Sequence, residues 1–228
     1  MVMVVHRSAG RLWEAAQEVI AAHHLLKHPF YQLWTEGKLP LEALRCYTRQ
    51  YFHQVLAFPR YLSAVHAHCP NLADRQEILS NLAAEELGTE NHPELWLRFA
   101  EGLGVERSTM GAPNPQTQEA LATQLRLSQQ PEYGAGLAVV WAYEVQVPEV
   151  ASQKIDGLTR HYGIQDERTL QFFRVHAVAD EHHSRTEEAI IGRWADTSLR
   201  QEAVLSTVTQ TAQALNRILD GVMIEARL

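Results

Sequence analysis

Three side chains in the C-terminal third of the sequence have the types and spacing of metal ligands: His176, Asp180 and His183. An α-helix turns by about 100° per residue, so Asp180 would project about 40° and His183 about 20° from the direction of His176. A helix here would therefore present two imidazoles and one carboxylate on one face. A single His-x-x-x-Asp pair is more often a surface hydrogen bond, and only further ligands elsewhere make a metal site the better interpretation.

Further candidate ligands lie in two other segments. Glu85 and His92 are seven residues apart, so on one continuous helix they would project within about 20° of each other, whereas Glu86 would point off that face. Glu144 lies in the apolar segment Val140-Trp-Ala-Tyr-Glu-Val-Gln-Val-Pro. A carboxylate buried in such a segment requires a partner or a metal.

The six residues are three carboxylates and three imidazoles, which suits two first-row divalent metals with positions open for oxygen. Their carboxylate content favours Fe or Mn over a closed zinc–thiolate site. Two divalent ions against three carboxylates leave about one positive charge, which an oxide or hydroxide bridge would neutralise. Ferritin-like proteins use Glu-x-x-His motifs, and no histidine here follows a glutamate at that spacing, so a different helical fold is expected.

The elements that must position these ligands are predicted to be helices throughout. Apolar residues recur at helical spacing, and no alternating run of β-branched residues or Asn-Gly hairpin turn is found. Pro93 and Pro148 fall inside predicted helices and should kink or end them. The sequence predicts a single all-α domain over residues 1–228, with helices at about 9–26, 40–68, 72–101, 115–129, 132–161, 167–194 and 198–225.

Composition excludes several classes of protein. The 228 residues are 46% hydrophobic and 21% charged, so intrinsic disorder is excluded. Twenty Lys and Arg against 27 Asp and Glu give a net charge of −7, which does not suit nucleic-acid binding. No uncharged run is long and apolar enough to cross a membrane. The two cysteines cannot form a disulfide framework and point to the reducing cytoplasm.

Further motifs occur in a fixed order around these ligands: His28-Pro-Phe-Tyr-Gln-Leu-Trp, Ala57-Phe-Pro-Arg-Tyr-Leu-Ser-Ala-Val-His, Tyr143-Glu144 and Lys154-Ile-Asp-Gly-Leu-Thr. With the ligand segments, they make the chain similar over about residues 23–219 to the haem-oxygenase-like di-metal oxidases. The resemblance is to the branch of the chlamydial death-domain-associating protein (CADD). It implies a seven-helix bundle of the TenA/PqqC type, a homodimer and the same six metal ligands.

The resemblance also implies an activity, that of a 4-aminobenzoate synthase in folate biosynthesis. In this branch a di-metal centre, Fe/Fe or Mn/Fe, activates O₂ with electrons from an external reductant, and a tyrosine of the protein itself supplies the aromatic product. The matching tyrosine is Tyr31, and the matching amino-group donor is Lys154. Tyr47 and Tyr143 match tyrosines that relay electrons or radicals. Phe172 stands where the branch has a further tyrosine, so a radical role at that position is not expected here.

Other functions remain open at this point. An oxidase of the same fold could act on an external fatty acid or amino acid with the same ligands, and a PqqC-like oxidase would need no metal. A TenA-type thiaminase requires a cysteine in the pocket, yet neither Cys46 nor Cys69 is near Glu144 in sequence. A protein-interaction module is a fourth alternative, for which no surface motif is found.

Overall fold

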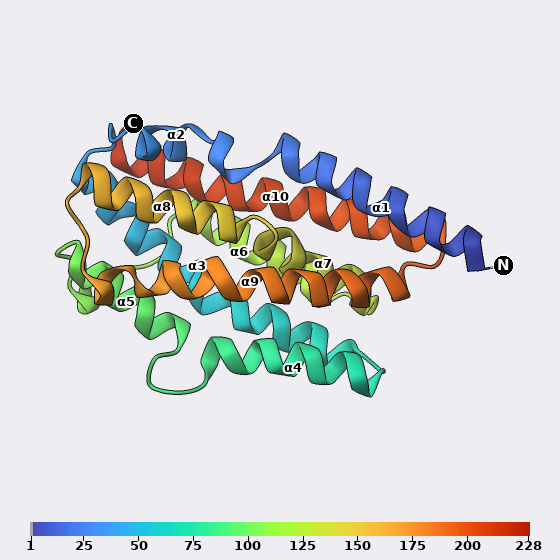
Figure 1. Ribbon diagram of the computed structural model, residues 1–228. Helices are drawn as coiled ribbons and strands as arrows, with labels where there is room; N and C mark the ends of the chain where they lie inside the picture. The colour runs from blue at the N-terminus through green and yellow to red at the C-terminus, as the bar shows by residue number, and fades with distance from the viewer. Residues whose placement is uncertain (1) are drawn as a thin grey trace.

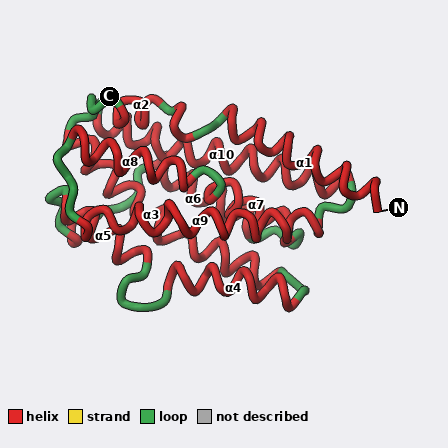
Figure 2. Tube along the Cα trace, in the orientation of Figure 1, coloured by secondary structure: helices red, strands yellow, loops and turns green. Residues whose placement is uncertain are grey.

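The computed structural model describes the backbone of residues 2–228 and the side chains of residues 10–228. This part of the chain is a bundle of α-helices joined by short loops, with no β-strand among the described residues (Figures 1 and 2). The expected all-α fold is confirmed. The helices are α1 (Val2–Ala22), α2 (Pro29–Thr35), α3 (Leu41–His68), α4 (Leu72–Glu86), α5 (His92–Gly102), α6 (Pro115–Ser128), α7 (Tyr133–Glu144), α8 (Val147–His161), α9 (Glu167–Trp194) and α10 (Ser198–Ala226), with 3₁₀ turns at Leu25–Lys27 and Arg107–Thr109.

The helix expected over 72–101 is in fact two helices, α4 and α5, separated by residues 87–91. Gly88 turns the chain with φ +83°, a conformation that favours glycine. The side chain of Asn91 then accepts a hydrogen bond from the backbone N–H of Glu94, and Pro93 lies in the first turn of α5. Proline begins a helix more easily than it continues one, because it has no N–H to donate.

The helix expected over 132–161 is likewise two helices, α7 and α8, which part at residues 145–146 just before Pro148. The predicted first helix, 9–26, ends earlier, at Ala22. A short helix that was not expected, α2, follows it: the His28 ring accepts from the backbone N–H of Phe30 and Pro29 occupies the first turn. These extra breaks give more helices than the seven expected.

The centre of the bundle is α7, whose residues from Gly134 to Glu144 are all buried. It packs against α3, α6, α9 and α10, while α9 also packs against α4, α5 and α8. Figure 1 shows α9 running between α8 on one side and α4 on the other. Helices α4, α5, α7 and α9, which carry the six candidate ligands, are therefore neighbours in space. Among the described residues, no helix combines the length and the apolar character that a membrane span requires.

Helix α8 packs closely against α2 where Gly157 faces Trp34. A Cβ atom at Gly157 would lie 2.5 Å from Cδ1 of the Trp34 ring, so only glycine fits without displacing the indole. This contact places Lys154, one turn earlier on α8, beside the helix that carries Tyr31.

Candidate metal centre

The first cluster of candidate ligands is formed by Glu85, His92 and His176, which come from α4, α5 and α9. All three are buried, and one potential ligand atom from each lies within 4.8 Å of the other two. Glu85 Oε2 and His92 Nδ1 are 2.6 Å apart. His176 Nδ1 lies 2.7 Å from the carbonyl oxygen of Phe172 and donates to it, which leaves Nε2 as the ligand atom. The pair of Glu85 and His92 was expected on one helix; the structure brings them together from two.

The second cluster is formed by Glu144, at the end of α7, with Asp180 and His183 of α9. Their potential ligand atoms also lie within 4.8 Å of one another. His183 Nδ1 is 3.8 Å from Glu144 Oε1 and 3.8 Å from Asp180 Oδ1. Glu144 Oε2, Asp180 Oδ2 and His183 Nδ1 are buried and have no hydrogen-bond partner.

Both clusters fit a divalent ion. With metal–nitrogen and metal–oxygen bonds of ~2.0–2.2 Å, neighbouring ligand atoms around one ion lie about 3.0–3.5 Å apart. Ligand atoms that already lie within 4.8 Å of one another can reach these separations through shifts of the side chains, and the 2.6 Å between Glu85 Oε2 and His92 Nδ1 would widen. Carboxylate oxygens without partners in a protein interior are costly, and a cation satisfies them. The oxygen and nitrogen donors suit iron or manganese.

The protonation of these groups is strongly affected by burial. Burial raises the pKa of Glu144 well above its ordinary value and also raises the pKa of Asp180. Burial, together with the neighbouring His92, lowers the pKa of His176 to about 4. Burial alone would lower the pKa of His92, but the hydrogen bond to Glu85 and the negative charge of Glu85 outweigh burial, so the pKa of His92 is raised. An incoming cation would have to displace protons from the carboxyl groups.

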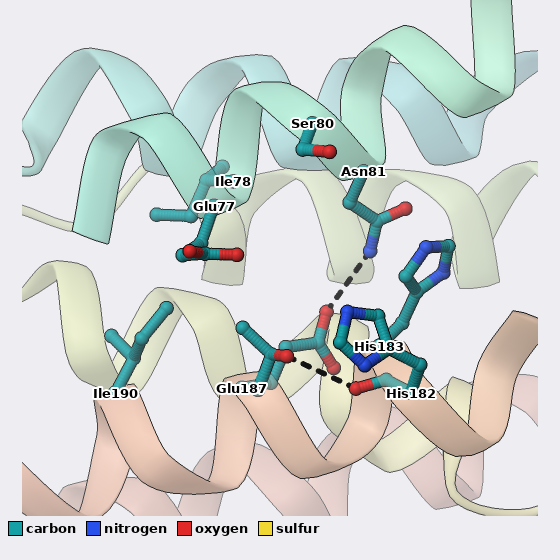
Figure 3. Close-up of a pocket in the computed structure, with 9 residues that line it drawn as sticks. Glu77, Ile78, Ser80, Asn81, His182, His183, Glu187 and Ile190 are labelled. Carbon is teal, nitrogen blue, oxygen red and sulfur yellow. Dashed lines mark hydrogen bonds between the residues drawn. The ribbon is translucent and has the colours of Figure 1, made fainter. Parts of the chain in front are cut away.

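Two polar residues at the second cluster were missed by the sequence analysis, Glu187 on α9 and Asn81 on α4. Asn81 Nδ2 donates to Glu144 Oε1 at 2.9 Å and to Glu187 Oε1 at 3.3 Å, and both new residues are buried. Figure 3 shows Asn81 reaching from α4 toward Glu187 on α9. The signal was present in the sequence, because Glu187 follows Asp180 by seven residues and His183 by four.

A small cavity lies between α4 and α9 beside this cluster, lined by Asn81, His183 and Glu187 among others (Figure 3). Its volume is about 40 Å³. A water molecule requires roughly 10–15 Å³ by this measure, so the cavity accommodates a few waters or an ion and not an organic substrate.

Tyr31, Tyr47 and Lys154 meet in a buried aromatic pocket formed by α2, α3 and α8. The hydroxyl oxygens of Tyr31 and Tyr47 are 3.0 Å apart and hydrogen-bonded. Lys154 Nζ lies 5.2 Å from the centroid of the Tyr31 ring, 5.4 Å from that of Tyr47 and 5.1 Å from that of Tyr51. Burial lowers the pKa of Lys154 to about 7.

Tyr51, which the sequence analysis also missed, connects this pocket to the metal-ligand clusters. Its ring centroid is 5.0 Å from that of Tyr47, and its hydroxyl interacts with that of Tyr143. Tyr143 directly precedes Glu144, and its hydroxyl interacts electrostatically with Asp180. Four buried tyrosines therefore form a row from the clusters to the aromatic pocket: Tyr143, Tyr51, Tyr47 and Tyr31.

Phe172 packs between the first cluster and Trp96. Its ring centroid is 4.1 Å from that of His176 and 4.8 Å from that of Trp96, and Trp96 stacks on Tyr51 at 5.2 Å. Phe172 has no hydroxyl to form a phenoxyl radical. The row of tyrosines reaches Tyr31 without it.

The family model described as "Iron-containing redox enzyme" matches residues 45–216. Two curated relatives are both named 4-aminobenzoate synthase. One, from Nitrosomonas europaea, is 43% identical over 92% of this chain and 89% of its own length, and the other, from Chlamydia pneumoniae, is 39% identical over 78% and 80%. A TenA homologue from Pseudomonas syringae pv. tomato has the same fold, with a TM-score of 0.79 at 15% identity over 94% of this chain and 92% of its own. The chain therefore belongs to the haem-oxygenase-like iron-containing redox enzymes, in the branch that includes these 4-aminobenzoate synthases.

Proposed function

We propose that this chain is an O₂-dependent 4-aminobenzoate synthase that makes its product from the side chain of Tyr31. The observation that carries the proposal is the burial of the Tyr31 phenol and the Lys154 amine in one pocket, with Nζ 5.2 Å from the ring centroid. 4-Aminobenzoate consists of a benzene ring with an amino group opposite a carboxylate. Tyr31 supplies the ring and its Cβ carbon, and Lys154 supplies the nitrogen. The names of the relatives support the product.

Two metal ions, Fe/Fe or Mn/Fe, would be held by the two clusters. The first cluster offers two imidazoles and one carboxylate, and the second offers two carboxylates and one imidazole. When bound, such a pair of ions supplies electrons for the reduction of O₂ and the oxidising power needed to act on a phenol. The proposed ligands are Glu85, His92 and His176 for one ion, and Glu144, Asp180 and His183 for the other.

The row of tyrosines carries oxidation from the clusters to Tyr31. Burial raises the pKa of Tyr31, Tyr47 and Tyr143 well above the ordinary value, so each phenol keeps its proton at neutral pH. Removing an electron from a buried phenol therefore requires that its proton leave as well. When Tyr47 has been oxidised to a phenoxyl radical, its oxygen, 3.0 Å from that of Tyr31, can take up the proton of Tyr31 together with the electron.

Lys154 acts as the nitrogen donor. With a pKa of about 7, a large fraction of the amine is neutral at physiological pH and has a free lone pair. In the overall conversion the Cα–Cβ bond of Tyr31 breaks and Cβ becomes the carboxylate carbon. Nζ forms a bond to the ring carbon that carried the phenol oxygen, the Cε–Nζ bond of Lys154 breaks, and the phenol oxygen leaves as water. O₂ is the oxidant, an external reductant supplies the remaining electrons, and each chain makes its product once.

An external fatty acid or amino acid as substrate is not favoured by the geometry. The cavity at the second cluster is about 40 Å³, and the side chains of Tyr31 and Tyr47 are already packed in the core. A PqqC-like reaction without metal would leave the buried carboxylate oxygens of Glu144 and Asp180 without partners. We further propose that the enzyme is a cytoplasmic homodimer whose product serves folate biosynthesis.

The proposal is tested by measuring metal content and 4-aminobenzoate together, on protein expressed with added iron and manganese. Wild type should contain about two metals per chain, and Glu85→Ala and His176→Ala should lose metal. Tyr31→Phe should keep its metals and make no product. Tyr61→Phe is the matched control, because Tyr61 is equally buried and its hydroxyl has no hydrogen-bond partner. Product from Tyr31→Phe would refute the self-derived route.

A further inference from the structure

Glu187 continues the face of α9 on which two residues of the second cluster lie. At about 100° per residue it projects about 40° from His183 and about 20° from Asp180. Its side chain is 4% exposed, whereas Glu188, the next residue, is only partly buried. A glutamate on a solvated face would not be enclosed in this way.

Asn81 forms the same kind of hydrogen bond with Glu187 and with Glu144. Its amide nitrogen donates to Oε1 of both carboxylates, at 3.3 Å and 2.9 Å. In both residues the other oxygen, Oε2, is buried and has no hydrogen-bond partner. The arrangement leaves one free carboxylate oxygen on each side of the amide, and Glu144 already belongs to the second cluster.

The charge of the site also points to a fourth carboxylate. Glu85, Glu144 and Asp180 carry three negative charges against the four positive charges of two divalent ions. Glu187 brings the balance to zero without an additional bridging anion. Burying a carboxylate without a counter-charge is expensive, so a cation within reach explains its presence in the interior.

The cavity between α4 and α9 supplies the space. Glu187, His183 and Asn81 line it, and the exposed His182 lies beside it (Figure 3). With about 40 Å³, it accommodates an ion with a water or two next to Oε2 of Glu187.

We propose that Glu187 is a further ligand of the metal ion held by Glu144, Asp180 and His183, and that Asn81 is the residue that positions both glutamates. The inference rests on the metal centre of the proposed function and adds a seventh protein ligand to it. The carboxyl groups of Glu144, Asp180 and Glu187 lie close together. Removing the charge of Glu187 should therefore stabilise the metal-free protein and weaken the binding of metal.

The test is Mn(II) binding to metal-free protein, followed by the electron paramagnetic resonance signal of free Mn(II), with thermal unfolding measured at each concentration. Wild type should bind two ions. Glu187→Gln keeps the shape and the contact with Asn81 but removes one charge. It should weaken one of the two binding events at least tenfold, raise the melting temperature of the metal-free protein, and reduce the increase that Mn(II) produces. Glu188→Gln is the matched control and should behave as wild type.

The outcomes distinguish a failure of the proposed metal centre from a failure of the proposed role of Glu187. Wild-type protein that binds no Mn(II) would overturn the metal centre itself. Wild type that binds two ions, with Glu187→Gln binding both at unchanged affinity and with the same metal-induced increase in melting temperature, would overturn only the role of Glu187. Circular dichroism of the metal-free variant verifies that it is folded. A melting temperature of the metal-free variant below that of metal-free wild type would assign Glu187 a purely structural role and so refute the proposal.

Discussion

Replacing Lys154 with methionine should stabilise the metal-free protein near neutral pH, and the gain should shrink as the pH rises. Burial lowers the pKa of Lys154 from 10.5 to about 7. This difference of about 3.5, at about 1.4 kcal/mol per pH unit, corresponds to about 5 kcal/mol. Attraction between the ammonium and the surrounding rings of Tyr31, Tyr47, Tyr51 and Phe173 offsets part of the cost, so about 5 kcal/mol is an upper bound.

The direction of the pH dependence follows from proton binding. Below about pH 7 the lysine is protonated in both the folded and the unfolded state, and folding carries the full cost of burying the charge. Between about pH 7 and 10.5 the unfolded state holds one more proton, so the free energy of unfolding of the wild type rises by up to about 1.4 kcal/mol per pH unit. Methionine has a similar length and no charge. The stability difference between the two proteins should therefore fall from at most about 5 kcal/mol near pH 6.5 to at most about 1 kcal/mol near pH 10.

The assay is denaturant unfolding of metal-free wild type and Lys154→Met between pH 6.5 and 10. All other titrating groups are common to both proteins and cancel in the difference. Lys27→Met, at an exposed lysine, is the control for the loss of one lysine charge. A difference for Lys154→Met that did not change with pH would refute the depressed pKa, and with it the neutral amine on which the nitrogen transfer depends.

Three further predictions concern the tyrosine row, the packing of α8 and the metal ligands. Tyr51→Phe removes the hydroxyl that interacts with Tyr143 and should lower the rate of 4-aminobenzoate formation at least about tenfold at unchanged metal content, a rise of about 1.4 kcal/mol in the barrier; an unchanged rate would exclude Tyr51 from the relay. Gly157→Ala places a methyl group against the Trp34 ring and should lower the free energy of unfolding by about 1–3 kcal/mol in denaturant titrations, whereas wild-type stability would contradict the close packing. Mn(II) affinity, measured by calorimetry, should rise as the pH is raised from 5 to 8, because burial holds a proton on Glu144 that the ion must displace; an affinity independent of pH would contradict that pKa.

Much of the fold could be predicted because apolar spacing reports helices directly. Helices α3, α6, α9 and α10 begin and end within a few residues of their predicted bounds. Pro93 and Pro148 were expected to kink or end their helices, and the structure shows breaks beside both, at residues 87–91 and 145–146. Proline in a helical pattern indicates a kink or an end, and Pro59 does not end its helix, because it lies within the continuous α3. Only tertiary packing decides between the two.

The candidate site was predicted where ligands share one face of a helix, as His176, Asp180 and His183 do. Glu85 and His92 were paired on the wrong premise that one continuous helix carries both. They are nevertheless close, because the loop between α4 and α5 brings Glu85 Oε2 and His92 Nδ1 within 2.6 Å of each other. Residues whose role depends on burial were missed. Glu187 lies in a charged segment of the sequence, where a glutamate is usually exposed to solvent. It is buried here because α4 packs against α9.

The central claim is that Tyr31 becomes the product. The most direct measurement is to express the protein with ring-¹³C tyrosine, purify it, and incubate it with metal, O₂ and reductant in unlabelled buffer. Mass spectrometry should find the ¹³C ring in 4-aminobenzoate and a loss of mass in the peptide that contains Tyr31, in at most one turnover per chain. Unlabelled 4-aminobenzoate, or an intact Tyr31 peptide after product has formed, would contradict the account.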